Sequence, residues 1–208
     1  MTRPSSRRPK VYDRAYYDRW YRNPRTRIHR RGAVERKVAL ALSAAEYLLE
    51  RRVETVLDVG CGEGPWQPVL ARLRPRIRYV GVDSSEFAVR RWGRTRGLRL
   101  GTFGQLADLG FNETYDLIVC SDVLHYVPSA ELRPGLDELG RLLGGIAWIE
   151  VFTSADRITG DFRDMKRRSP AFYSRLFREA GLVPCGLYAF VRDDVAGALT
   201  AFERGSAR

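Results

Sequence analysis

The 208-residue sequence contains only three cysteines and two histidines, residues that disulfide frameworks and many metal centres need. No apolar run approaches the ~20 residues of a membrane helix. The three cysteines, Cys61, Cys120 and Cys185, lie far apart and show no metal-ligand or redox spacing. They are expected to be reduced core residues of a cytoplasmic protein. No metal site and no membrane contact are predicted.

Lysine is also scarce, because Lys10, Lys37 and Lys166 are the only ones. Residues 1–52 hold 15 basic residues against 5 acidic ones, which places +10 of the +11 formal net charge in the first quarter of the chain. A solvated, arginine-biased segment explains this, and it is favoured because charge alone carries little specificity. The alternative is a segment that contacts nucleic acid or another polyanion.

The domain organisation is expected to be simple. Residues 1–10 consist largely of Arg, Ser and Pro and predict a disordered basic tail. Arg7 and Arg8 are not followed by the apolar region that a secretory signal needs. No repeat or interdomain linker is found, so residues 11–208 are expected to form a single domain, long enough to bury most of its apolar surface.

The most informative stretch runs from Thr55 to Gly64. Its first half is apolar and predicts a buried strand. The alternate glycines Gly60, Gly62 and Gly64 then allow a tight turn and the close approach of a ligand to the backbone. Pro65 suits the first turn of the helix that follows.

A second apolar run, residues 79–82, ends in Asp83, about 20 residues beyond the glycines. At this offset an acidic residue accepts hydrogen bonds from a bound ribose. The spacing Gly-x-Gly-x-Gly differs from the Gly-x-Gly-x-x-Gly of dinucleotide sites. Asp58 before the turn and Glu63 inside it suit a cationic or amine-bearing ligand better than a pyrophosphate.

Residues 58–64 resemble the first motif of class I S-adenosylmethionine (SAM)-dependent methyltransferases, and residues 81–83 resemble the second. The resemblance covers about residues 33–204. It implies an α/β fold with a doubly wound, mostly parallel seven-stranded sheet, whose last strand is antiparallel and whose faces are both covered by helices. It also implies SAM as the cofactor. A glycine turn that merely packs a helix on a sheet is the structural alternative.

The resemblance assigns cofactor contacts residue by residue. Asp83 would hold the ribose, and Asp58, Gly60 and Gly62 the methionine part. Trp66 would be either a wall of the site or a packing residue. Ser84 and Ser85 are expected to cap the next helix. The complete set of predicted cofactor contacts is Asp58, Gly60, Cys61, Gly62, Trp66, Asp83, Ser84, Gln105, Leu106 and Ser121.

Gln105 and Leu106 follow a predicted strand at residues 98–102. The family usually has an acidic residue at this place, where it contacts the adenine amino group. Gln105 departs from that pattern, but its amide oxygen can accept a hydrogen bond from an amino group. Leu106 would flank the adenine ring.

An apolar strand at residues 115–120 is followed by Ser121, Asp122 and, a few residues later, His125. It resembles the family's fourth motif, and in a parallel sheet ligands bind beyond the carboxyl ends of the strands. His125 is therefore either the proton acceptor of the reaction or a helix-terminus histidine without chemistry. The sequence is not Asn/Asp-Pro-Pro-Tyr, which counts against methylation of nucleobase amino groups.

Residues 11–32 form a candidate lid. The aromatic residues Tyr12, Tyr16, Tyr17, Trp20 and Tyr21 recur at helical spacing and predict a face that packs on the core or closes over the ligand. A cation for the SAM carboxylate is expected from one of Arg25, Arg27, Arg30, Arg31 and Arg36, and the spacing selects none of them.

The remaining elements complete the expected fold. Helices are predicted at residues 33–49, 65–73, 86–96, 132–143 (ended by Gly144 and Gly145) and after Ser169 and Pro170, with a strand at residues 146–152 and final strands within 182–191 and 196–202. Residues 153–168 are expected to form a loop or short helix over the mouth of the site that selects the acceptor.

The sequence thus predicts methyl transfer from SAM to an O or N nucleophile of a small-molecule acceptor by a monomer or weak dimer. Alternatives are an RNA methyltransferase that uses the basic segment, a nicotinamide- or nucleotide-binding module, and a catalytically silent SAM-binding subunit.

Overall fold

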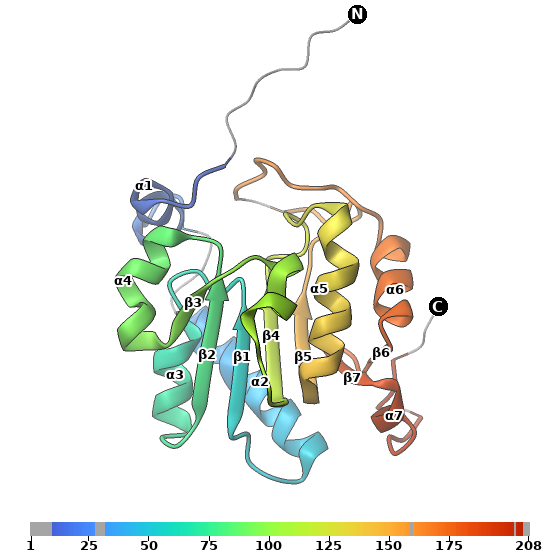
Figure 1. The fold of residues 1–208 in the computed structure, drawn as a ribbon. Helices are drawn as coiled ribbons and strands as arrows, with labels where there is room; N and C mark the ends of the chain where they lie inside the picture. Colours follow the sequence, from blue (N-terminus) through green and yellow to red (C-terminus); the bar gives the residue numbers. More distant parts are fainter. Residues whose placement is uncertain (1–9, 28–31, 159, 202, 206–208) are drawn as a thin grey trace, which may run out of the picture.

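A computed structural model describes residues 10–27, 32–158, 160–201 and 203–205. Its centre is a seven-stranded sheet with the order β3-β2-β1-β4-β5-β7-β6 (Figure 1). Strand β7 is antiparallel to β5 and β6, and the other pairings are parallel, which confirms the predicted fold class. The strands are β1 (Thr55–Val59), β2 (Arg78–Asp83), β3 (Leu98–Leu100), β4 (Tyr115–Ser121), β5 (Leu143–Glu150), β6 (Leu182–Pro184) and β7 (Ala189–Arg192).

The helices alternate with these strands along most of the chain. They are α1 (Arg14–Tyr17), the π-helical turn η1 (Asp18–Arg22), α2 (Ala33–Leu49), α3 (Trp66–Leu73), α4 (Glu86–Arg96), the 3-10 segment η2 (Phe103–Leu109), α5 (Ser129–Leu142), α6 (Pro170–Glu179) and α7 (Asp193–Ala196). In Figure 1, α5 lies in front of the sheet and α2 behind it.

Both faces of the sheet are buried because successive side chains of a strand point to opposite faces. Leu57 and Ile118 belong to the core that packs against α5 and α6. Val56 and Leu117, their neighbours in sequence, belong to the core under α2 and α3. All five residues of β1 are buried, as expected for a central parallel strand that is covered on both sides.

Two of the three predicted serine caps are correct. The Ser85 hydroxyl accepts a hydrogen bond from the Ala88 amide at 3.1 Å, and the Ser169 hydroxyl accepts one from Phe172 at 3.2 Å. Both serines therefore satisfy an amide that a helix leaves unpaired at its start. Ser84 lies before the cap of α4 and is exposed.

The glycine pair Gly144 and Gly145 does not end a helix, as the sequence had predicted, but lies inside β5. A Cβ atom on Gly145 would lie 2.2 Å from the carbonyl oxygen of Asp116, and one on Gly144 would lie 2.9 Å from Thr114 Oγ1. These glycines therefore let β5 start close beside β4, immediately after α5 ends.

The prediction for the end of the chain was also wrong in one part. Both final strands, β6 and β7, come from residues 182–192, joined by a tight turn at Gly186. Residues 196–201 form the end of α7 and a turn instead of a strand. Residue 202, like residues 1–9 and 28–31, lies outside the described residues.

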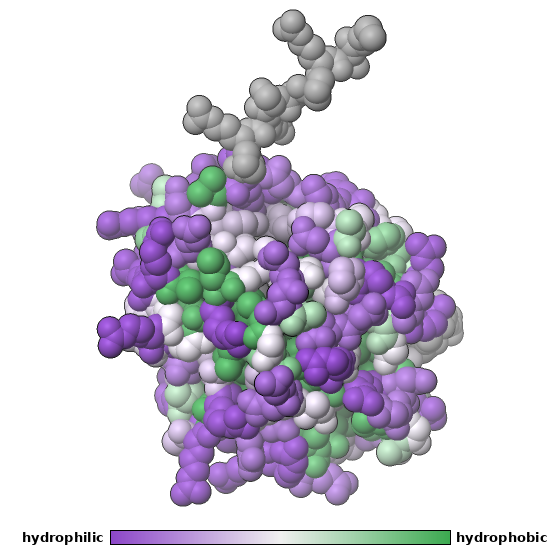
Figure 2. All heavy atoms as spheres, viewed as in Figure 1, coloured by the Kyte–Doolittle hydropathy of each residue, from purple (hydrophilic) through white to green (hydrophobic). Residues whose placement is uncertain are grey.

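Hydrophilic residues cover much of the face seen in Figure 2, and hydrophobic residues show between them in patches. The three cysteines are free: Cys61 and Cys120 are buried and Cys185 is half-buried. In the described part of the chain, no helix has the length and apolar character required to cross a membrane.

Candidate active site

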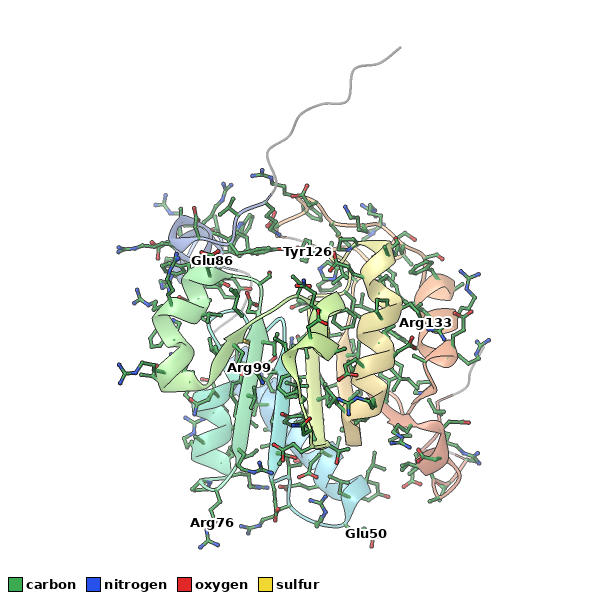
Figure 3. The ribbon with its side chains drawn as sticks, in the orientation of Figure 1. Glu50, Arg76, Glu86, Arg99, Tyr126 and Arg133 are labelled. Carbon is green, nitrogen blue, oxygen red and sulfur yellow. The ribbon has the colours of Figure 1, made fainter. Side chains whose placement is uncertain are left out.

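A cavity of about 310 Å³ lies at the carboxyl ends of β1, β2 and β4. Figure 3 shows Tyr126, one of its wall residues, at this end of the sheet and Glu50 and Arg76 at the opposite end. The cavity wall includes eight of the ten predicted cofactor contacts: Asp58, Gly60, Cys61, Gly62, Trp66, Asp83, Ser84 and Ser121.

The glycine turn forms the floor of the cavity. Gly60 and Gly62 have φ values of +73° and +57°, which side chains disfavour. A Cβ atom on Gly60 would lie 2.2 Å from Val123 Cγ2, so this position also lacks space for a side chain. The amides of Gly60 and Cys61 donate to the Val82 carbonyl at 2.7 and 3.1 Å, which joins the turn to the end of β2.

Asp83 is held in one orientation by two backbone amides. Its Oδ2 accepts from Gly62 at 2.7 Å and its Oδ1 from Ser85 at 2.8 Å. Each carboxylate oxygen has a second lone pair, so Asp83 can still accept hydrogen bonds from the two hydroxyls of a ribose. Burial raises the pKa of Asp83, and the two amide hydrogen bonds oppose this shift.

Asp58 is 3 % exposed and accepts a hydrogen bond from the Tyr79 hydroxyl at 2.8 Å. Burial raises its pKa to about 7, against the Tyr79 hydrogen bond, and the nearby Asp83 charge adds to the increase. Two buried carboxylates therefore share this end of the cavity. A ligand that carries a sulfonium and an ammonium group compensates their charge, so these residues fit SAM.

Among the described residues that line the cavity, the cation is Lys37 of α2, which is not one of the predicted arginines. The Lys37 ammonium pairs with Glu150 and lies 3.2 Å from the Ser121 hydroxyl, which donates to Glu150 at 2.6 Å. Arg25, Arg27 and Arg36 are exposed, and Arg30 and Arg31 lie outside the described residues. The sequence held a signal for Lys37, since it interrupts the apolar stripe of α2 beside Val34 and Val38.

Asp122 follows β4 directly and has an unusual backbone conformation, with φ at +63°. Its amide donates to the Glu150 carbonyl at 3.0 Å, and its side chain lines the cavity. The buried Oδ1 atom has no hydrogen-bond partner among the described residues. Burial, followed by the charge of Glu150, raises the pKa of Asp122 to about 6, and Lys37 opposes this shift. Strained backbones and unpaired buried carboxylates are concentrated at functional sites.

His125, the predicted proton acceptor, is placed differently. It is 2 % exposed and is absent from the described residues that line the cavity. Its Nδ1 accepts from the Phe152 amide at 3.4 Å. Burial, followed by the positive charge of Lys10, lowers the pKa of His125 to about 4. Asp122, three residues earlier, has its side chain on the cavity wall.

Gln105 and Leu106 are not on the cavity wall either. Leu106 is fully buried in the core between α5 and the sheet, and Gln105 is exposed, with its Oε1 accepting from the Thr102 hydroxyl at 3.0 Å. The reason is that β3 ends at Leu100, two residues earlier than predicted. The loop that follows therefore brings Thr102 and Phe103 to the cavity, and the side chain of Gln105 points outward.

Trp66 combines both roles that its position suggested. It lines the cavity, and at 5 % exposure it also belongs to the core under α2 and α3. Cys61, between the glycines of the turn, also lines the cavity but is only 6 % exposed, and burial raises its pKa.

The aromatic segment forms a cap over the cavity. Tyr12, Tyr16, Tyr17 and Tyr21 all line it, and burial raises the pKa of each. The predicted lid segment therefore contacts the cavity directly, and Tyr17 also packs against Phe87 of α4, with ring centroids 5.9 Å apart.

Three contacts attach this cap to the rest of the protein. Arg22 donates to both carboxylate oxygens of Glu63 at 2.5 Å, Ser85 donates to the Tyr12 carbonyl at 2.5 Å, and Lys10 pairs with Asp161 at 2.6 Å. Glu63 therefore contacts the cap, and it is not among the described residues that line the cavity. Lys10, assigned to the disordered tail, has a side chain that is only 6 % exposed.

Comparison with known proteins agrees with this geometry. The family model described as "Methyltransferase domain" matches residues 57–145. An uncharacterized protein, MJ0906, from Methanocaldococcus jannaschii is 28 % identical over 141 residues. The match covers 64 % of the chain but only 37 % of that relative.

Solved structures show the same fold at low identity. The sugar N-methyltransferase KedS8 from Streptoalloteichus superimposes with a TM-score of 0.65 at 16 % identity, over 92 % of this chain and 96 % of that one. SAM-bound CalS10, an amino pentose methyltransferase from Micromonospora echinaspora, gives a TM-score of 0.57 at 16 % identity, over 76 % and 91 % of the two chains.

Residues 57–145 therefore match a methyltransferase domain, and the sheet has the fold of the methyltransferase structures named above. Both findings agree with the resemblance of the glycine turn to class I SAM-dependent methyltransferases. Among the described residues, no three His, Cys, Asp or Glu side chains lie close enough to hold a metal ion.

Proposed function

We propose that the protein transfers the methyl group of SAM to an oxygen or nitrogen nucleophile of a small-molecule acceptor. The observation that carries this proposal is the distribution of carboxylates along one cavity. Asp58 and Asp83 stand at the glycine turn, and Asp122 stands with an unpaired oxygen at the carboxyl end of β4. The two ends fit a cofactor and an acceptor respectively.

Each residue on the cavity wall has its own part in binding or in the reaction. Asp83 binds the ribose hydroxyls, and the glycine turn with Asp58 binds the methionine part, with Lys37 at the carboxylate. The bound cofactor supplies a methyl group already activated by its sulfonium. The protein therefore needs mainly to align donor and acceptor and to exclude water. Asp122 Oδ1 receives the proton that the nucleophile loses.

The tyrosine cap supports a small acceptor. Four tyrosines close the cavity from the N-terminal segment, and their anchors to Glu63, Ser85 and Asp161 hold them over the strand ends. A polymer would have to displace this cap to reach Asp122. The structural neighbours named above, which are described as sugar and amino pentose methyltransferases, also favour a small acceptor.

Calorimetry with SAM and NAD side by side tests the cofactor assignment. We expect SAM to bind and NAD not to bind, and we expect Asp83→Ala to weaken SAM binding because the ribose loses its acceptor. An acceptor screen that measures S-adenosylhomocysteine release, with amines and alcohols as separate groups, then tests the transfer. SAM binding without release for any acceptor would favour the silent subunit.

The alternative of an RNA substrate depends on the basic N-terminal quarter. Several of its cations are paired within the protein: Lys10 with Asp161, Arg22 with Glu63, Lys37 with Glu150 and Arg51 with Asp116. These pairs reduce the charge available to a polyanion. Salt-sensitive RNA binding that disappears on truncation of residues 1–31 would revive this alternative.

A further inference from the structure

The side chain of Lys10 is enclosed by aromatic rings. Its Nζ lies 3.8 Å from the ring centre of Tyr126, 4.9 Å from that of Tyr12 and 5.1 Å from that of Tyr16. Asp161 completes the enclosure with a carboxylate oxygen 2.6 Å from the Nζ. We call this group of three tyrosines and Asp161 the ammonium cage.

The ammonium cage has the composition of a recognition site for organic cations. The faces of aromatic rings attract ammonium groups, and several rings with one carboxylate form the enclosures that bind alkylated ammonium ligands. A buried lysine usually needs such compensation, because burial disfavours its charged form. Here burial lowers the pKa of Lys10, while the hydrogen bond and charge of Asp161 oppose that decrease.

The cage shares its walls with the active-site cavity. Tyr12, Tyr16 and Tyr126 all line that cavity as well. Tyr126 follows Asp122 by four residues, and its hydroxyl donates to the Asp161 carbonyl at 2.6 Å. The three tyrosine rings are therefore walls of both the cage and the cavity, and they alone separate a cation in the cage from the acceptor end of the cavity.

Lys10 is an occupant that can leave without the loss of a helix or strand. Residues 10–12 belong to no helix or strand and precede α1, which begins at Arg14. Its aromatic contacts and its ion pair are ones that another ammonium group of similar size could make in its place.

We propose that the ammonium cage binds a cationic amine group of the acceptor and that Lys10 occupies it as an intramolecular competitor when no acceptor is bound. The inference rests on the proposed methyl transfer and narrows its acceptor to organic amines. It predicts that removal of the Lys10 side chain opens a site for free ammonium compounds.

The test uses the full chain saturated with S-adenosylhomocysteine, as wild type, Lys10→Ala and Lys166→Ala. Lys166 is an exposed lysine outside the cage and provides the matched control. Choline is titrated by calorimetry, with 3,3-dimethylbutanol as its uncharged isostere. We expect Lys10→Ala to bind choline at least ten-fold more tightly than wild type and Lys166→Ala, and at least ten-fold more tightly than it binds the alcohol.

A second pair of variants tests whether choline binds in the ammonium cage. In the background of Lys10→Ala, Tyr126→Leu should remove choline binding, whereas Tyr188→Leu, a change at an exposed tyrosine outside the cage, should retain it. Equal binding of choline and the alcohol, or no choline binding to a folded Lys10→Ala protein, would overturn the proposal and reduce Lys10 to an anchor of the cap.

Kinetic measurements distinguish a failure of the cage proposal from a failure of the proposed methyl transfer. In Lys10→Ala, choline should compete with amine acceptors and the KM for amines should fall, with no such effect for neutral alcohols. Choline binding without any S-adenosylhomocysteine release would support the ammonium cage as a binding site and contradict the proposed methyl transfer. S-adenosylhomocysteine release with amines that choline does not inhibit would support methyl transfer and contradict the role of the cage.

Discussion

The two ends of the cavity are built in different ways. The proposed cofactor end is built around the glycine turn and Asp83, which come from two adjacent strands and are joined by hydrogen bonds from backbone amides. The proposed acceptor end combines Asp122 and the ammonium cage, whose residues come from segments as distant as 12 and 161. The first depends on local geometry and the second on long-range contacts, so substitutions should affect them separately.

The largest effect is expected for Asp122→Asn. If Asp122 accepts the proton, the change should lower kcat by about 100-fold, the lower range for loss of a general base, with little change in SAM affinity. In the wild type, activity should rise with pH through about 6 as the carboxylate ionises. Steady-state rates from pH 5 to 8 measure both effects.

Stability gives this prediction a second readout. The pKa of Asp122 is near 4 in the unfolded chain and about 6 in the folded protein, so the folded protein binds more protons between these two pH values. Ionisation of Asp122 therefore lowers the free energy of unfolding as pH rises through this range. Asp122→Asn removes that penalty and should not lower Tm at pH 7.5. Asp164→Asn is the control, because Asp164 has the same φ of +63° but is exposed. A lower Tm for Asp122→Asn would indicate a structural role.

The next largest effect concerns the cofactor end. Gly60→Ala adds a Cβ atom that meets Val123 and also strains a positive φ, so the turn must shift. The expected loss in SAM affinity is roughly 30-fold, equivalent to ~2 kcal/mol of overpacking. Gly110→Ala has a similar φ of +64° with no atom of a described residue within 4 Å of the new Cβ. The control should bind SAM like wild type, and calorimetry compares the two.

Proton release provides a test of Asp58 that needs no acceptor. The pKa of Asp58 is raised to about 7, so part of the free protein is protonated at neutral pH. A bound cation favours the carboxylate, and SAM binding at pH 6.5 should therefore release a fraction of a proton. Calorimetry in two buffers with different ionisation enthalpies measures this fraction. Asp58→Asn should abolish the release, and a persistent release would assign it to another group.

The difference between local and long-range contacts also explains what the sequence could predict. Gly60, Gly62, Asp58 and Asp83 line one cavity, as expected, because strand, turn and offset are local patterns, and their contacts with a cofactor stay a prediction. Lys37 was missed because its partner Glu150 is 113 residues away, and Lys10 because only the fold brings Tyr126 and Asp161 to it. His125 and Asp122 follow the same strand, and the backbone conformation that turns one into the cavity leaves no mark in the residue order.

The smallest effect is expected where the sequence assignment and the structure disagree. Gln105 is exposed and hydrogen-bonded to Thr102, so Gln105→Ala should change SAM affinity by less than about two-fold, as surface substitutions usually do. Phe103→Leu removes an aromatic wall and should weaken SAM binding by about five-fold, which corresponds to ~1 kcal/mol of aromatic contact. A larger loss for Gln105→Ala than for Phe103→Leu would restore Gln105 as the adenine contact and would show that SAM binding reshapes residues 101–105.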